Sequence, residues 1–482
     1  MGDLVPILCE EVIPGDTFRM NSEVMMRLVP MIAPMMHRVN VYTHFFFVPY
    51  RIIWEEWEKF ITGGEDGEAL PTVPYIAKDS YTAAGRSGKG TLADYLGCKT
   101  YDGSQLSGSD RLVSVLPFRA YQTIYNEYYR DQNLETKVNV AKTSGIELNV
   151  SAMMALRKRA WEKDYFTSAL PWTQKGGDVL LPNDVVLKDD STAQGKLVTP
   201  VTHTPTGTTT GIGHDSAGGL QNDGSIDLVY DPNGSLGSET TIEELRRATK
   251  LQRWLERNAR SGSRYIEQML SHFGVKSSDA RLQRPEYLGG GKTPIVISEV
   301  LQTSSTDATS PQGEMAGHGI AVGNSHRFKK FFEEHGYVIG IVSVLPRTTY
   351  MQGTRKHFYK DDRFDFFWPE FAQLGEQPVT NGELYTTFDP SVDNQTFGYQ
   401  SRYSEYKFIP STVHGEMRDT LKFWHMAREF SSAPALNSTF VKSDPTHRVF
   451  AVTDPNEHKL IVQVYNNLKA IRPIPYFNNP TL

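Results

Sequence analysis

GYVIGIVSVL, at residues 336–345, is apolar at nearly every position. A short apolar run of this kind predicts a central β-strand that is covered on both faces. Two further stretches, HRVNVYTHFFFV at 37–48 and LIVQVY at 460–465, alternate along the chain as half-buried strands do. Because these stretches lie near the two ends and in the second half of the chain, we predict one long-range β core that contains both ends.

The composition is that of a globular protein rich in turns. The 482 residues are 39% hydrophobic and 22% charged, and they include 39 Gly and 27 Pro. Such a chain can form a packed core, but its glycines and prolines indicate many connections between short elements. A mostly helical bundle is not expected. Helices are predicted over 118–130, over 152–164 with Ser151 as the N-cap, and over 242–274 with a break near Gly262.

The net acidity of the protein is confined to one segment. The chain carries 50 Lys and Arg against 56 Asp and Glu, a net charge of −6. Residues 176–240 hold 9 of the acidic and 2 of the basic residues, which leaves 47 acidic and 48 basic residues elsewhere. This Gly- and Thr-rich segment has too little apolar surface to order itself. We predict an exposed insertion at 176–240, within a core formed by 1–175 and 241–482, both with helical excursions.

No motif indicates a reaction centre, a cofactor or a metal ion. Cys9 and Cys98 lie in no zinc pattern, and the 13 His are scattered singly. GGGKT at 289–293 lacks the upstream glycine and the following helix of a phosphate-binding loop, so we interpret its glycines as a turn. The sequence shows no signal-peptide pattern and no apolar run of about 20 residues. We expect a soluble, cytoplasm-made protein that is not an enzyme.

A stripe of basic residues follows the third predicted helix. Spacings of three and four place them on one helical face, where they could track a phosphate backbone. Two other interpretations stay open: a solvated face, supported by pairs such as Glu256 with Arg260, or salt bridges to a neighbouring subunit. The candidate nucleic-acid residues are Arg246, Lys250, Arg253 and Arg257, and the same stripe continues to Arg260 and Arg264.

Residues 355–368, RKHFYKDDRFDFFW, interleave basic and aromatic side chains. Such a mixture can stack unpaired bases on Phe or Tyr while cations hold the phosphates. Arg355 and Lys356 are therefore two further candidate nucleic-acid contacts. The alternative, which we favour, is an alternating β segment with Phe364 and Phe366 on one face.

Six segments, in this order, resemble the major capsid protein of the Microviridae, and most closely its gokushovirus branch. The resemblance as a whole covers most of the chain outside the polar insertion. The six segments are NVYTHFFFVPYRIIWEEWEKFITG at 40–63, RAWEKDYFTSALPWTQKG at 159–176, SHFGVKSSDARLQRPEYLGG at 271–290, GYVIGIVSVLPRTTYMQG at 336–353, RFDFFWPEFAQLGEQPV at 363–379 and SRYSEYKFIPSTVHGEMRDTLKFWHMAREFSSAPALNSTFV at 401–441.

The resemblance implies a mainly β fold, an eight-stranded antiparallel jelly-roll sandwich with long loop and helical insertions. It also implies a T=1 icosahedral shell of 60 copies around a circular single-stranded DNA genome, with the insertion at 176–240 forming protrusions at the threefold axes. The expected place is the virion, after assembly in the host bacterial cytoplasm. Expected partners are copies of the chain itself, an internal scaffolding protein, the DNA and a host cell-surface receptor, without membrane insertion.

Charge adds one more expected partner. Sixty chains at −6 total −360, so the bulk charge of the shell cannot neutralise a genome. Local basic patches or a small basic DNA-binding protein must do so.

The polar insertion is also a candidate surface for host attachment, because recognition often resides in exposed loops on a rigid scaffold. The alternative is a variable loop that is merely tolerated. The candidate attachment residues are Thr204, Thr208, Gly211, His214 and Asp215.

A different class of function also stays open. The chain could be a β-sandwich carbohydrate-binding or carbohydrate-active protein whose aromatic residues at 359–368 line a sugar site.

Overall fold

The computed structural model describes residues 1–65, 68–83, 85–177, 179, 242–262, 264–276, 278, 283–303, 312–454 and 456–475, together with four short strands between 188 and 229. The chain divides into two compact units. The first consists of Met1–Thr173 and Ser261–Leu482, and the second is Gln174–Arg260. Of the second unit, the described parts are α7 (Ile242–Ser261) and the strand pairs β6 (Lys188–Asp189) with β9 (Leu228–Val229) and β7 (Ile212–His214) with β8 (Leu220–Asn222).

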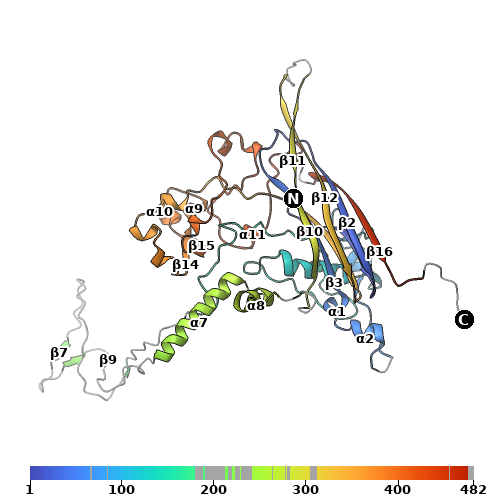
Figure 1. The fold of residues 1–482 in the computed structure, drawn as a ribbon, viewed down its shortest axis with the longest axis horizontal. Coiled ribbons are helices and arrows are strands. Elements are labelled where there is room, and N and C mark those ends of the chain that lie inside the picture. The colour runs from blue at the N-terminus through green and yellow to red at the C-terminus, as the bar shows by residue number, and fades with distance from the viewer. Residues whose placement is uncertain are drawn as a thin grey trace. The chain divides into compact units, whose positions relative to one another are not determined.

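Two four-stranded antiparallel sheets dominate the described part of the first unit (Figure 1). The first sheet has the order β1 (Val5–Val12), β13 (Gly336–Pro346), β3 (Val39–Pro49) and β10 (Glu286–Pro294). The second has the order β11 (Val296–Leu301), β12 (Met315–Phe331), β2 (Thr17–Leu28) and β16 (Leu460–Ile471). The mainly β, antiparallel architecture is confirmed, and it is consistent with a jelly roll.

The two ends of the chain meet in the second sheet. β2 pairs with β16 along its whole length, from Thr17 opposite Ile471 to Leu28 opposite Leu460. The prediction that strands from both ends share one core is therefore confirmed. This pairing spans more than four hundred residues, so neither strand is stable without the rest of the fold.

Aromatic side chains from both sheets fill the space between them. Phe45 of β3 lies 5.6 Å from Phe328 of β12, measured between ring centroids, and Phe47 lies 4.8 Å from Phe332. Phe18 of β2 contacts the same Phe332 ring edge-on at 5.3 Å. Each buried ring of this size contributes roughly 1.5–3 kcal/mol to stability. The two sheets are therefore held face to face as a sandwich.

The other face of the first sheet is also covered. Phe46, Ile339 and Ile341 point away from the sandwich and pack into a cluster with the helices of residues 50–156. β13 is consequently buried on both faces, as its uniform apolarity predicts. The elements of this covering layer are α1 (Tyr50–Ile53), α2 (Trp57–Thr62), β4 (Tyr75–Ala77), α3 (Lys78–Tyr81), α4 (Leu92–Tyr95), β5 (Arg111–Ser114), α5 (Leu116–Ile124), the π-helix Tyr125–Tyr129 and α6 (Val150–Met153).

A third cluster lies in the long connection between β13 and β16. It packs Tyr165 and Phe166 against Tyr350, Phe397 and Phe440. Its short elements are the 3-10 helices Lys356–Phe358, Arg363–Asp365, Pro369–Phe371, Ser404–Tyr406, Gly415–Arg418 and Lys422–Trp424, with β14 (Glu376–Thr380), α9 (Asn381–Leu384), α10 (Pro390–Asp393), β15 (Thr396–Ser401) and α11 (Ser438–Val441).

The predicted helix over 152–164 is wrong. α6 covers only Val150–Met153, and its N-cap is Asn149. Beyond it, the backbone N–H of Arg157 donates to the Tyr121 hydroxyl at 3.0 Å, and the Arg157 carbonyl accepts from the backbone N–H of Leu4 at 2.8 Å. These tertiary partners take the groups that a helix would pair internally, so they override the local helix propensity.

The interpretation of GGGKT as a turn is also wrong, because residues 289–293 lie inside β10. The glycine at 290 serves close packing between strands. A Cβ placed there would lie 2.5 Å from the Thr43 carbonyl oxygen of β3.

The predicted break near Gly262 is confirmed. α7 ends at Ser261, and the next helix, α8, spans Tyr265–Phe273.

Candidate nucleic-acid and host-contact surfaces

The four candidate cations of the basic stripe are exposed on α7. Nine of the 20 residues of this helix are charged, and Arg246, Lys250, Arg253 and Arg257 fall on one face by their spacing. Among the described residues, no carboxylate forms an ion pair with any of the four. Arg260 does pair with Glu256 at 3.8 Å, which is the arrangement expected of a solvated face. α7 therefore presents free cations next to one local ion pair.

Arg264 does not continue the stripe, because the chain breaks at Gly262 before reaching it. Its guanidinium Nη2 donates to the backbone carbonyl of Asn126 at 3.1 Å, and Nη1 lies 3.3 Å from Glu267 Oε1. Arg264 also precedes α8 as its N-cap residue. Arg264 therefore holds Glu267 in the first turn of α8 and connects the start of this helix to the π-helix through the Asn126 carbonyl.

Arg355 and Lys356 are already engaged in the fold. Arg355 Nη2 donates to the Pro410 carbonyl at 3.4 Å. Lys356 Nζ donates to the Pro378 carbonyl at 2.7 Å and lies 3.3 Å from Glu383 Oε1. Because the Glu383 side chain is almost fully buried, Lys356 supplies the positive charge that a buried carboxylate requires. These contacts favour a structural role for both residues.

The β segment expected around Phe364 and Phe366 is wrong. Arg363–Asp365 form a 3-10 helix that is capped by Asp362. The Asp365 carboxylate accepts backbone hydrogen bonds from Asp361 and Asp362 at 3.2 and 3.1 Å. These local bonds replace the extended pairing that alternation would need. The aromatic rings of this segment remain half exposed, and Lys360 Nζ lies 5.2 Å from the centroid of Phe366.

The candidate attachment residues fall almost entirely outside the described residues. Thr204, Thr208, Gly211 and Asp215 belong to this undescribed part of the chain. His214 is the last residue of β7, which pairs with β8 between Ile212 and Asn222.

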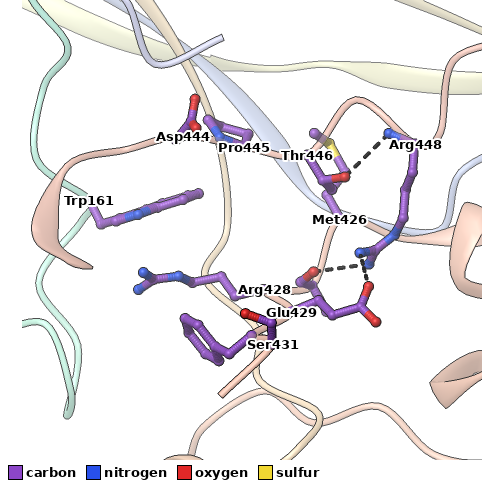
Figure 2. A pocket seen from close by; sticks show the side chains of 11 residues that line it. Trp161, Met426, Arg428, Glu429, Ser431, Asp444, Pro445, Thr446 and Arg448 are labelled. Atoms are coloured by element: carbon purple, nitrogen blue, oxygen red, sulfur yellow. Dashed lines mark hydrogen bonds and ion pairs between the residues drawn. The ribbon is translucent and has the colours of Figure 1, made fainter. Parts of the chain in front are cut away.

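A cavity of about 510 Å³, which no sequence motif indicates, lies beside the third cluster (Figure 2). The guanidinium of Arg428 lies 5.3 Å from the ring centroid of Trp161 and 4.1 Å from that of Phe440. Its Nη2 also donates to the Phe440 carbonyl at 2.8 Å. Trp161 and Arg428 are 267 positions apart, so no local spacing connects them in the sequence.

The charges around this cavity are largely balanced within the fold. Arg448 donates to the backbone carbonyls of Lys422 and Ala427 at 2.9 Å each, and its Nη1 lies 3.2 Å from Glu429. Burial lowers the pKa of both Arg428 and Arg448. Glu429 and Asp444 line the same space, so the cavity carries both signs of charge. We interpret it as part of the packing of residues 426–448.

The described residues contain no group of three or more His, Cys, Asp or Glu side chains arranged to hold a metal ion. No helix in the described part of the chain combines the length and apolarity needed to cross a membrane.

The described residues form a β sandwich with long excursions, exposed cations and exposed apolar side chains. These features are compatible with a structural protein of the β-sandwich coat type. The family described as "Capsid protein (F protein)" matches residues 1–482, and the chain belongs to that family.

Individual relatives agree with the family match. The chain is 38% identical to the capsid protein VP1 of Bdellovibrio phage phiMH2K, with 99% of this chain and 92% of the relative covered. It is 36% identical to the capsid protein VP1 of Chlamydia phage 1 (100% and 93% covered) and 32% identical to that of Spiroplasma virus 4 (100% and 92% covered).

Membership of this family settles the broad function. The resemblance to gokushovirus capsid proteins, inferred from the six segments, is confirmed. The protein is a structural component of a phage virion and assembles into a shell, and its family is not an enzyme family. The carbohydrate-active alternative is therefore set aside.

Proposed function

We propose that 60 copies of this chain form a T=1 icosahedral shell around a circular single-stranded DNA genome. Assembly takes place in the host bacterial cytoplasm with an internal scaffolding protein, and a small basic DNA-binding protein supplements the charge of the shell. A closed set of symmetric contacts between identical subunits is the usual way to build such a particle.

The observation that carries this proposal is the placement of large apolar side chains on exposed excursions of the sandwich. Leu148 is 89% exposed and Phe388 is 91% exposed, and Leu70, Phe358 and Ile409 each exceed 70%. Leu70 and Leu148 lie in the covering layer of residues 50–156, and Phe358, Phe388 and Ile409 lie in the connection between β13 and β16, so exposed apolar side chains occur on two excursions. Exposed apolar residues gathered on loops are typical of surfaces that become buried in an assembly.

Electron microscopy of the protein, expressed with its scaffolding partner, tests the proposal. We expect closed particles whose image reconstruction has icosahedral symmetry with 60 subunits, and native mass spectrometry should give sixty times the chain mass plus the mass of any bound scaffolding protein. Open sheets, tubes or shells with another subunit number would contradict it.

For the α7 stripe, we propose contact with the genome. Its four exposed cations lack a described anionic partner, and phosphate groups would supply one. The double variant Lys250→Glu with Arg253→Glu reverses two of these charges and should reduce the DNA content of assembled particles. Unaltered DNA content would reject contact by this helix.

For the insertion at 176–240, we propose protrusions at the threefold axes that contact the host surface. Its net charge of −7 supports a position away from the genome. Deletion of residues 202–223 should leave assembly intact and reduce adsorption to host cells. Unchanged adsorption would count against receptor binding, whereas loss of particles would show that the insertion serves assembly.

A further inference from the structure

One face of the second sheet carries a compact group of cations. β2 buries its even-numbered residues in the sandwich and presents its odd-numbered residues to the outside. On this outer face, Arg19 stands opposite Lys329 of β12 on one side and opposite Lys469 of β16 on the other. The next outward pair places Arg327 opposite Asn21, which in turn faces Asn467. We call Arg19, Arg327, Lys329 and Lys469 the basic sheet patch.

The strand geometry holds these four charges close together. Directly opposite residues of an antiparallel pair have Cβ atoms about 5 Å apart, and neighbouring strands are spaced by about 4.8 Å. Figure 1 shows β12, β2 and β16 side by side, and the register fixes which residues align across them. A shallow hollow of about 390 Å³ opens between the four cations and the amides of Asn21 and Asn467.

The basic sheet patch has no anionic partner in the described part of the chain. All four side chains are exposed, and none of them forms an ion pair or hydrogen bond with a described residue. On β2, the first acidic residue beyond the patch is Glu23, which stands opposite Tyr465. Like charges directly opposite one another destabilise a sheet, so three cations in one row lower the stability of the subunit. An anion bound at this outer face would offset their repulsion.

Exposed aromatic rings border the patch at both ends. Phe331 of β12, 55% exposed, follows Lys329 on the same face, and Tyr465 of β16, 58% exposed, lies beyond Asn467. Cations that hold phosphates, interleaved with rings on which bases stack, are the combination that binds single-stranded nucleic acid without sequence preference. An acidic peptide would use the charges but would have no use for two flanking rings.

We propose that the basic sheet patch binds the phosphate backbone of single-stranded DNA, with Phe331 and Tyr465 as stacking platforms. This inference rests on the proposed function, and it adds to the α7 stripe a second surface of the subunit that meets the genome. The outer face of the sheet β11-β12-β2-β16 then points into the shell. The helical layer over the first sheet lies on the opposite side of the sandwich, away from the DNA.

The test removes the four charges without changing the strands. The variant Arg19→Gln, Arg327→Gln, Lys329→Gln, Lys469→Gln is compared with the unmodified protein in two measurements. The first is the nucleic-acid content of assembled particles, and the second is the binding of oligo(dT) to unassembled subunits over a range of salt concentrations. We expect about a tenfold or larger loss of affinity, and a slope of log K against log salt that falls by about 2 to 3, since each single-strand phosphate contact contributes about 0.7.

Two control variants separate charge from folding. Arg27→Gln removes an exposed cation from the same strand but outside the patch, and it should change neither measurement. The variant Arg19→Lys, Lys329→Arg, Lys469→Arg keeps every charge and should keep the salt slope. A fourth variant, Phe331→Ser with Tyr465→Ser, should weaken oligo(dT) binding while leaving the salt slope unchanged, because it removes stacking alone.

The outcomes distinguish this inference from the proposed function. Particles of normal form with unchanged DNA content and an unchanged salt slope would overturn the inference and leave the shell intact. The fourfold Gln variant could instead lose binding of poly(glutamate) and retain binding of oligo(dT). In that case the patch binds an acidic protein segment, and the inference is also overturned. Failure of the unmodified protein to form shells would instead contradict the proposed function.

Discussion

A single buried ion pair organises the layer that covers the first sheet. The side chains of Arg119 of α5 and Glu147 are both fully buried, and Arg119 Nη2 lies 2.8 Å from Glu147 Oε2. Arg119 Nη1 also donates to the carbonyls of Ile53 and Thr143 at 3.3 and 3.0 Å, and Glu147 Oε1 accepts the backbone N–H of Asn149. The pair therefore joins α5 to the end of α1 and to the irregular segment at residues 143–149.

Replacing one partner of this pair should be strongly destabilising. Arg119→Met leaves the Glu147 carboxylate buried without a countercharge, which costs about 3–5 kcal/mol. The double variant Arg119→Met with Glu147→Leu removes both charges and should recover part of that loss. Urea unfolding of unassembled subunits, followed by tryptophan fluorescence, measures both effects. Equal destabilisation of the single and double variants would show that the lost backbone contacts, and not the stranded charge, dominate.

His37 should make the subunit sensitive to mild acid. Burial lowers the pKa of His37 from 6.5 to about 4, although its Nε2 donates to the Arg347 carbonyl at 2.7 Å. His425 and Arg448 face the same imidazole and disfavour its charged form. Because the folded pKa lies below the unfolded value, the unfolded chain binds the proton more readily as the pH falls. The stability contributed by neutral His37 is complete above about pH 6.5 and is lost progressively down to about pH 4.

The variant His37→Gln tests this pH dependence. Gln has no titrating group and can still donate to the Arg347 carbonyl. We expect the urea midpoint of the unmodified protein to fall between pH 6.5 and pH 4 by more than that of the variant. Parallel declines of the two midpoints would assign the acid sensitivity to other groups.

At the scale of the element, β13 depends on one small residue. Gly340 stands opposite Phe45 of β3, and a Cβ added to it would lie 2.7 Å from Cε1 of that fully buried ring. The ring has no space to withdraw, because it packs at 5.6 Å against Phe328 of the second sheet. Gly340 thus allows the central strand to approach the aromatic core.

Gly340→Ala should destabilise the sandwich by about 1–3 kcal/mol through overpacking. Gly177→Ala is the matched control, because nothing lies within 4 Å of its added Cβ. The difference in urea midpoint between the two variants gives the packing cost. A neutral Gly340→Ala would mean that the Phe45 ring can shift with little penalty.

The elements that the sequence predicts well are those whose pattern reflects burial alone. The run at 336–345 predicts the doubly covered β13, and the alternation at 460–465 predicts β16. Predictions fail where distant partners decide the backbone. The residues after α6 are held by Tyr121 and Leu4, and the glycines at 289–293 are fitted against β3. Neither partner is visible from local sequence.

Because distant partners are not visible from local sequence, only one of the two basic surfaces can be predicted from the sequence. The α7 stripe is detectable because helical spacing brings its cations together within a dozen residues. The basic sheet patch joins residues 19, 327, 329 and 469, which only the strand register aligns. No counting along the chain reveals it.

At the scale of the whole molecule, a residue that does not stabilise the isolated subunit can still stabilise the contacts between subunits in the shell. Phe388 has a positive φ of 63° and a side chain that is 91% exposed. A bulky residue in the left-handed region is strained, and exposure gives it no packing energy in the isolated subunit. Its backbone N–H donates to the buried Asp393 carboxylate at 3.0 Å, so the conformation is fixed by the fold. Such a residue benefits the subunit only if another copy covers it.

The double variant Phe388→Asn with Leu148→Ser should therefore weaken shell assembly without lowering the stability of the subunit. Asn tolerates a positive φ, and both replaced side chains are exposed, so the unfolding free energy of the subunit should change by less than about 0.5 kcal/mol. The shell should lose buried apolar area at each of its repeated contacts, which raises the protein concentration needed for assembly. Light scattering of assembly reactions over a concentration series measures that threshold, with Phe388→Tyr as the control that keeps the ring. An unchanged threshold would place both side chains on the outer or inner surface of the shell, away from every contact between subunits.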